Sequence, residues 1–176
     1  MKELIFASAL FLALAGPASA RDCPQKIEQR DVRGASLSGL LGPGATIKIA
    51  VGFYACHDVQ REDVVAYSGG AAPIVKVVKG LPGDKFHLQQ AEGGWRLLIN
   101  GELARNSLNE PYLLSEGGYK MLSLYESGYN GVIPSGSYLI LGDLAGGTLD
   151  SSIFGLIDKD DILGKVLRPE PAKAKS

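Results

Sequence analysis

Short β-rich segments separated by glycine and proline make up most of the sequence after its first twenty residues. The 176 residues include 23 glycines and 9 prolines. This density of turn-forming residues favours short strands over long helices. Few windows place apolar residues at the period of an amphipathic helix. The sequence therefore predicts a mainly β protein with few short helices.

Eight segments have the composition of strands and are bounded by turn signals. They are residues 46–53, 64–67, 73–78, 86–90, 95–99, 119–125, 138–141 and 153–157. Asn100-Gly101 is a strong signal for a tight hairpin turn. Residues 37–41 and 160–162 are each expected to form one short helical turn.

The N-terminus has the pattern of an export signal. Residues 4–15 are apolar, Gly16-Pro17 breaks a helix, and residues 18–20 (Ala-Ser-Ala) match the small-x-small pattern that precedes cleavage. The apolar run is shorter than the roughly 20 residues that span a membrane, and an uncleaved anchor is the alternative. We expect a signal peptide at residues 1–20, one domain at 21–167 and a flexible tail at 168–176.

Composition excludes several partners and cofactors. Lys and Arg number 18 against 19 Asp and Glu, and this balance disfavours nucleic acid, which requires an excess of positive charge. With two Cys and two His, neither a metal nor another cofactor is expected. Cys23 and Cys56 could pair in an oxidising compartment, and two free thiols are the alternative. His57 and His87 are interpreted as surface or core residues.

Three segments carry candidate chemistry, and the first is residues 32–41. Gly34 permits an unusual backbone turn. A serine on such a bend, here Ser36, can present its hydroxyl outward and its N–H toward a substrate carbonyl. Ser38 is an equally plausible hydroxyl on local grounds, and a simple loop is the alternative for both.

The second segment, residues 74–85, contains two candidate lysines. In a strand, Lys76 shares a face with Ile74 and Val78, and Lys79 points to the opposite side. A lysine amine acts as a base only when neutral, and burial favours the neutral form. One buried lysine could therefore take a proton from a nearby serine without histidine. The alternative is that the strand is half-exposed and Lys76 extends its amine into solvent.

The third segment is residues 141–155. Gly142-Asp143 is expected to form a turn. Thr148 and Asp150 are two positions apart, so both can project to one side of an extended segment. Their hydroxyl and carboxylate could orient an amine or brace a neighbouring loop. The alternative is a calcium-like or simply capped turn.

Together these segments resemble the type I signal peptidases, the serine–lysine endopeptidases that remove signal peptides from exported proteins. The resemblance covers residues 32–166, and its motifs follow the family's order. They are G-x-S-[hydrophobic] at 34–37, an R-G-D-[IV]-V-like run at 61–65, K-x-x-x-G-L-P-G-D at 76–84, I-N-G at 99–101 and P-x-G-x-[YF]-x-x-[LM]-G-D at 134–143. The lysine-containing box is the most specific of these. The fold that it implies is a coiled β-sheet or barrel.

The resemblance implies that Ser36 is the nucleophile and Lys76 the general base, and it selects them over Ser38 and Lys79. The backbone N–H of Ser36 would donate to the oxyanion. These roles are carried over from the family's motifs by position.

Four further residues are implied to support the site. Thr148 falls where the family has a serine that holds the lysine amine. Asp150 falls at an acidic residue that keeps the site in shape, and Asp143 ends the last motif. Gly34 stands where some members have a hydroxyl side chain, so a second oxyanion donor must come from elsewhere.

The sequence also departs from the family pattern. Both arginines and two asparagines of the N-R-x-x-N-S-x-D-S-R run are missing, and Ser152 stands where Asp150 would have its Arg neighbour. Leu37 replaces a methionine and Gly39 a proline. Typical members keep a membrane anchor, whereas residues 1–20 are expected to be removed. We therefore interpret the chain as a divergent, exported relative.

The implied function is a serine endopeptidase that cleaves exported precursors after Ala-x-Ala-like sites. A restricted substrate, such as a pilin or another protein of a secretion or conjugation system, fits the divergence. We expect a periplasmic protein with peripheral contact to the inner membrane. The alternative is a catalytically silent relative that binds peptides as an assembly factor. A self-cleaving repressor-type protease is disfavoured because no DNA-binding segment is present.

Overall fold

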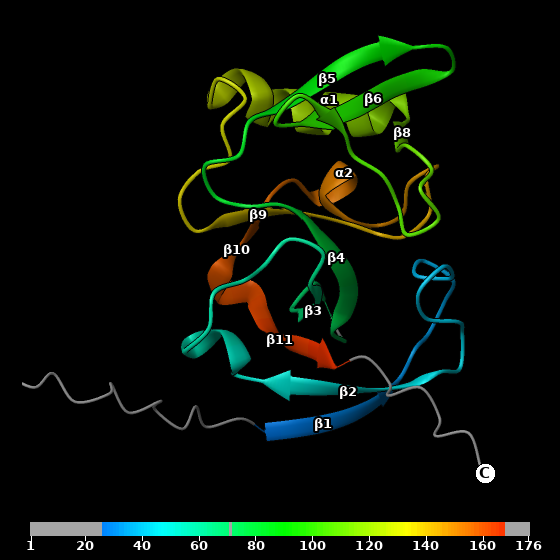
Figure 1. The fold of residues 1–176 in the computed structure, drawn as a ribbon, viewed down its shortest axis with the longest axis vertical. Coiled ribbons are helices and arrows are strands. Elements are labelled where there is room, and N and C mark those ends of the chain that lie inside the picture. The colour runs from blue at the N-terminus through cyan, green and yellow to red at the C-terminus, as the bar shows by residue number, and fades with distance from the viewer. Residues whose placement is uncertain (1–25, 71, 168–176) are drawn as a thin grey trace, which may run out of the picture.

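Two antiparallel sheets form most of the computed structural model, which describes residues 26–70 and 72–167 (Figure 1). The seven-stranded sheet has the order β1-β2-β11-β3-β4-β9-β10. Its strands are β1 (Lys26–Asp31), β2 (Thr46–Val51), β3 (Val64–Tyr67), β4 (Ile74–Gly80), β9 (Ser137–Leu141), β10 (Ile157–Asp158) and β11 (Ile162–Leu167). The mainly β prediction is confirmed.

The smaller sheet has four strands, in the order β5-β6-β7 with β8 paired to β6. These are β5 (Phe86–Ala91), β6 (Gly94–Ile99), β7 (Glu102–Leu103) and β8 (Leu113–Leu114). Helix α1 (Glu116–Gly128) packs against this sheet and against the short helix α2 (Ser151–Phe154). In Figure 1 the smaller sheet and α1 lie at the top, and the strands β1, β2 and β11 lie at the bottom.

The strand predicted at residues 119–125 is wrong, because this segment belongs to α1. The side chain of Ser115 caps the helix by accepting a hydrogen bond from its first turn. Tyr119, Leu122 and Tyr125 pack against the same hydrophobic core. A spacing of three residues places side chains on one side of a helix, and it would place them on alternating faces of a strand.

Of the other predicted elements, one strand is wrong, whereas the hairpin turn and one helical turn are confirmed. The strand predicted at 153–157 is wrong over most of its length, because α2 occupies its start and β10 begins only at its end. The hairpin turn is confirmed, since Asn100 and Gly101 have φ of 53° and 85°. A 3-10 helix η2 (Lys159–Asp161) matches the predicted helical turn, and a second, η1 (Phe53–Ala55), was not predicted.

Strand β9 separates two hydrophobic cores. Leu139 and Leu141 pack into the core under the smaller sheet and α1. Tyr138 and Ile140 pack into the core on the opposite side, with residues of β3 and β4. This alternation follows the two-residue period of a strand, and it fixes the position of the loop that leaves β9.

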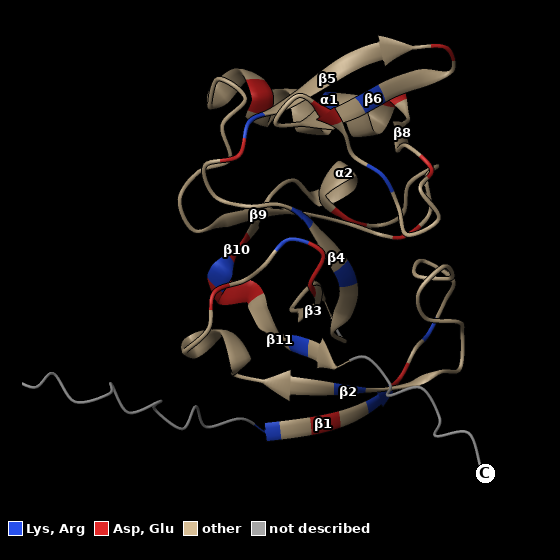
Figure 2. Cartoon of the chain, in the orientation of Figure 1, with Lys and Arg blue, Asp and Glu red and all other residues tan. Residues whose placement is uncertain are grey.

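Charged residues of both signs are interspersed over the two sheets (Figure 2). Within the part of the chain that the structure describes, no helix has the length and apolar character needed to cross a membrane. The predicted signal peptide at residues 1–20, the tail at 168–176 and Cys23 lie outside the described residues.

Replacing Leu122 with alanine should destabilise the fold by about 2–5 kcal/mol, because its side chain is completely buried between α1 and the smaller sheet. The measurement is the free energy of unfolding in urea. Leu124→Ala is the matched control, since Leu124 lies on the same helix and is 67% exposed. Equal losses in the two variants would contradict the assigned packing of α1.

Candidate active site

Ser36 lies in the turn between β1 and β2. Gly34 has a φ of 82°, in the left-handed region that favours glycine. The carbonyl oxygen of the half-buried Ser36 accepts a hydrogen bond from the N–H of Asp143 at 2.7 Å. The exposed Ser38 donates its hydroxyl to the carbonyl oxygen of Ala35 at 2.5 Å. Ser36 is therefore joined to the loop after β9, whereas the hydroxyl of Ser38 bonds within the turn.

Lys76 extends from β4, and only 2% of its surface is exposed. Its Nζ donates a hydrogen bond to Oγ of Ser36 at 2.8 Å. Burial lowers the pKa of the Lys76 amine below its ordinary value of 10.5, and the charge of Asp150 partly opposes this effect. A lowered pKa increases the population of the neutral amine, which is the form able to accept a proton.

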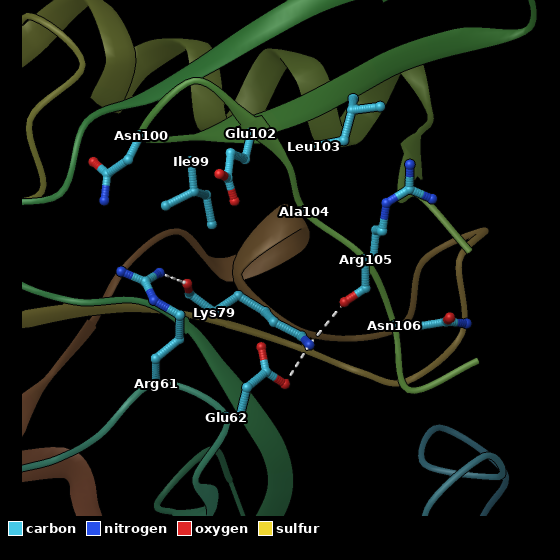
Figure 3. Close-up of a pocket in the computed structure, with 10 residues that line it drawn as sticks. All are labelled: Arg61, Glu62, Lys79, Ile99, Asn100, Glu102, Leu103, Ala104, Arg105 and Asn106. Carbon is cyan, nitrogen blue, oxygen red and sulfur yellow. Dashed lines mark hydrogen bonds and ion pairs between the residues drawn. The ribbon is translucent and has the colours of Figure 1, made fainter. Parts of the chain in front are cut away.

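Lys79 lines a separate polar pocket of about 380 Å³, located between β4 and the β6–β7 hairpin (Figure 3). Its Nζ lies 2.7 Å from a carboxylate oxygen of Glu62 and 2.8 Å from the carbonyl oxygen of Arg105. Arg61 donates to the carbonyl oxygen of Lys79. The structure thus brings Lys76 to Ser36 and directs Lys79 to a different set of partners.

The carboxylate of Asp150 is almost completely buried and accepts four hydrogen bonds. Oδ2 accepts from the N–H of Gly142 at 2.9 Å and from the hydroxyl of Thr148 at 2.6 Å. Oδ1 accepts from the N–H and the hydroxyl of Ser152 at 3.0 and 2.8 Å. Ser152, which stands where the family's arginine is expected, therefore donates to Asp150 as a neutral group.

Thr148 is predicted to hold the lysine amine, and the structure instead shows its hydroxyl donating to Asp150. No hydrogen bond joins Thr148 to Lys76 within the residues that the structure describes. The Thr148 side chain nevertheless lies beside the Ser36 turn. A Cβ placed on Gly142 would collide with Thr148 and would lie 2.8 Å from the carbonyl oxygen of Ser36. Glycine at 142 thus permits the two segments to approach.

Asp143 connects the Ser36 turn to Ser107, and its N–H donates to the carbonyl oxygen of Ser36. Its carboxylate is 1% exposed and accepts from the N–H and hydroxyl of Ser107 at 2.8 and 2.6 Å. A Cβ at Gly39 would collide with this carboxylate and would lie 2.6 Å from Oγ of Ser107. The contact explains glycine in place of the family's proline. Sequence reasoning missed Ser107, which lies 36 positions from Asp143 in a segment without a motif.

Ser36 opens onto a groove of about 760 Å³, a volume within the usual range of binding sites. The groove extends along β1, β2 and the start of β4. Its lining includes Arg33, Ser36, Leu37, Ile47, Ile74 and Val75. Polar and apolar residues thus both line the groove beside the Ser36 hydroxyl.

The remaining sequence candidates have other partners. Cys56 is disulfide-bonded. His57 stacks on Phe53, with ring centroids 4.1 Å apart, and Nδ1 of His87 lies 2.7 Å from a carboxylate oxygen of Glu126. Among residues 26–70 and 72–167, no group of three or more His, Cys, Asp or Glu side chains could hold a metal ion.

Comparison with known proteins identifies the family. The family model for signal peptidase, peptidase S26, matches residues 3–169. Signal peptidase IB of Staphylococcus aureus (strain COL) is 31% identical over 147 residues, which are 77% of this chain and 73% of that protein. A crystal structure of a signal peptidase I from Enterococcus faecalis V583 aligns with a TM-score of 0.43 and 23% identity, and covers 62% of this chain and 97% of that one.

The chain therefore belongs to the signal peptidase family, peptidase S26. The resemblance found in the sequence motifs is confirmed. The chain is accordingly a hydrolase of the serine-type endopeptidase class.

Asp150→Asn should move the pH midpoint of kcat/KM to lower pH. The negative charge of Asp150 raises the pKa of Lys76, so its removal leaves the lowering by burial less opposed. The variant should also lose about 1–3 kcal/mol of stability, because an amide NH2 cannot accept the donors that the carboxylate accepts. The measurements are a pH–rate profile and urea unfolding. Asp160→Asn, at an exposed position in η2, is the control. A midpoint that moves upward would contradict the effect of the Asp150 charge on the pKa of Lys76.

Proposed function

We propose that the chain is a Ser–Lys peptidase in which Ser36 is the nucleophile and Lys76 the general base. The observation that carries this proposal is the 2.8 Å distance between Oγ of Ser36 and the buried Nζ of Lys76. A nucleophile within hydrogen-bond distance of a base is the geometry that covalent catalysis requires. The lowered pKa of the Lys76 amine supplies the neutral base.

Proton transfers in the proposed cycle involve only these two side chains. The neutral amine of Lys76 takes the hydroxyl proton of Ser36 as Oγ attacks the scissile carbonyl carbon. The Ser36 N–H stabilises the resulting oxyanion, and the Lys76 ammonium protonates the leaving amine as the C–N bond breaks. Water then attacks the acyl-enzyme and gives a proton to Lys76, which returns it to Oγ of Ser36.

The substrates that we propose are exported precursors with small residues at the first and third positions before the cut. An extended peptide can lie along the groove beside β1 and β4, and its apolar side chains would contact Ile47, Ile74 and Val75. The departures from the family pattern around Asp150 support a restricted substrate, such as a pilin or another protein of a secretion or conjugation system.

Export to the periplasm is part of the proposal. The leader pattern at residues 1–20 and the disulfide-bonded Cys56 both favour an oxidising compartment. We propose residues 21–167 as one catalytic domain that contacts the inner membrane peripherally.

A catalytically silent, peptide-binding role is not favoured. Such a protein would need the groove alone, and nothing in peptide binding requires a lysine buried against a serine. Removing the ammonium of Lys76 from water costs free energy that a binding protein would avoid with an apolar residue.

The decisive experiment uses the full chain in detergent with a precursor that carries an Ala-x-Ala site. Ser36→Ala should abolish cleavage, and Lys76→Ala should reduce it by about 10²–10⁴-fold, the usual contribution of a general base. Ser38→Ala and Lys79→Met are the matched controls and should cleave at the parent rate, because the hydrogen bonds of these side chains go to Ala35, Glu62 and Arg105. Cleavage that survives substitution of both Ser36 and Lys76 would refute the dyad.

A second comparison tests the restricted substrate. A pilin precursor and a general secretory precursor with the same Ala-x-Ala site are cleaved in parallel. A higher kcat/KM for the pilin precursor supports the restriction, and equal values contradict it.

The pH dependence provides an independent prediction. The kcat/KM value should rise as pH increases through the pKa of Lys76, with a midpoint below 10.5, because only the neutral amine accepts the proton. Lys76→Arg should remain inactive over the whole range, because a guanidinium does not lose its proton. An active arginine variant would exclude the proposed base.

A further inference from the structure

The hydroxyl of Tyr67 has an unusual environment. Tyr67 is 2% exposed, and its hydroxyl oxygen is a buried polar atom without a hydrogen-bond partner in the part of the chain that the structure describes. Buried tyrosine hydroxyls normally find a partner, because burial without one costs free energy. The position therefore calls for a partner that the resting site does not supply.

Strand pairing places Tyr67 beside Lys76. In the β3–β4 ladder, Val65 pairs with Lys76 and Tyr67 pairs with Ile74. Paired residues, and residues two apart in a strand, share a face, so all four side chains project to the same side. Tyr67 is therefore the diagonal neighbour of Lys76. The backbones of such diagonal positions are typically about 7–8 Å apart, a separation that aromatic and long side chains can bridge.

The aromatic ring of Tyr67 is held in place. It packs in the core on that face of the sheet, together with Val65 and Ile74. A Cβ at Gly69 would lie 2.9 Å from Cε2 of Tyr67 and would also collide with Ile74. The packing around the ring therefore fixes the position of the Tyr67 hydroxyl.

Asp150 acts on both Lys76 and Tyr67 through its charge, and raises the pKa of each. Its carboxylate already accepts four hydrogen bonds, which is about its full capacity. A further N–H or O–H donor therefore finds no free position on Asp150. Burial is the larger cause of the raised pKa of Tyr67, and its hydroxyl therefore keeps its proton.

The proposed reaction creates a new set of donors at this place. When Lys76 takes the proton of Ser36, the amine becomes an ammonium with three N–H donors. One donor faces the reacting atoms, because the proton passes on to the leaving amine. The others need acceptors in a buried site where Asp150 is occupied.

We infer that Tyr67 is a positioning residue whose hydroxyl oxygen accepts a hydrogen bond from the Lys76 ammonium formed during the reaction. This inference rests on the proposed Ser–Lys function. Tyr67 keeps its own proton throughout, so the transfers between Ser36, Lys76 and the leaving amine remain balanced. Among the described residues the hydroxyl has no hydrogen-bond partner at rest, and it gains one in the charged intermediate.

The test is Tyr67→Phe in the full chain, assayed on the Ala-x-Ala precursor. Loss of a hydrogen bond to a charged group should reduce the plateau kcat by roughly 10- to 100-fold. The pH midpoint of kcat should move to lower pH, because the hydroxyl favours the ammonium form of Lys76. The free energy of unfolding should stay equal or increase, since the resting site loses no hydrogen bond.

Tyr54→Phe is the matched control. Tyr54 is buried in the same core, and its hydroxyl donates to Asp63 at 2.9 Å. This variant should lose stability and keep the parent kcat and midpoint, which is the opposite result.

Unchanged kcat and midpoint in Tyr67→Phe would overturn the inference. A loss of kcat accompanied by lower stability and an unchanged midpoint would also overturn it, because it would indicate a structural role. Failure of the dyad itself is distinguishable, since Lys76→Ala would then cleave at the parent rate. An inactive Lys76→Ala together with a fully active Tyr67→Phe would remove only the role of Tyr67.

Discussion

Burial of the Lys76 amine is the interaction on which the candidate site depends. Lys76 lies on β4, which pairs with β3 and β9, and only 2% of its surface is exposed. The cost of this burial falls on the charged form, so the sheet itself favours a neutral amine. The Asp143 N–H then holds the Ser36 turn against the same region. The burial of Lys76 therefore contributes both to the packing of the sheet and to the chemistry proposed for the site.

Sequence periodicity predicts that Lys76 and Lys79 lie on opposite faces of a strand, but it does not say which face carries chemistry. The resemblance to signal peptidases selected Lys76, and the structure places its amine against Ser36. Most strands and the hairpin turn followed from β-rich composition and turn residues. The polar edge strand β1 did not, because its side chains are largely exposed and its backbone pairs with β2.

Other features were not accessible from sequence because they depend on contacts between distant segments. Ser107 reaches Asp143 across 36 positions, and this contact gives the reason for Gly39. The segment at residues 119–125 has a strand-like composition, yet the cap at Ser115 and the burial of one side make it a helix. The Tyr67 hydroxyl, which has no hydrogen-bond partner within residues 26–70 and 72–167, likewise depends on strand register and burial, which composition does not encode.

The four neutral donors around Asp150 have a consequence for the surroundings in which the site works. Dissolved ions screen exposed charges, whereas a carboxylate held by buried amide and hydroxyl dipoles is screened much less. The influence of Asp150 on Lys76 should therefore vary little with ionic strength. An enzyme built in this way should keep the same pH dependence in dilute and in saline media.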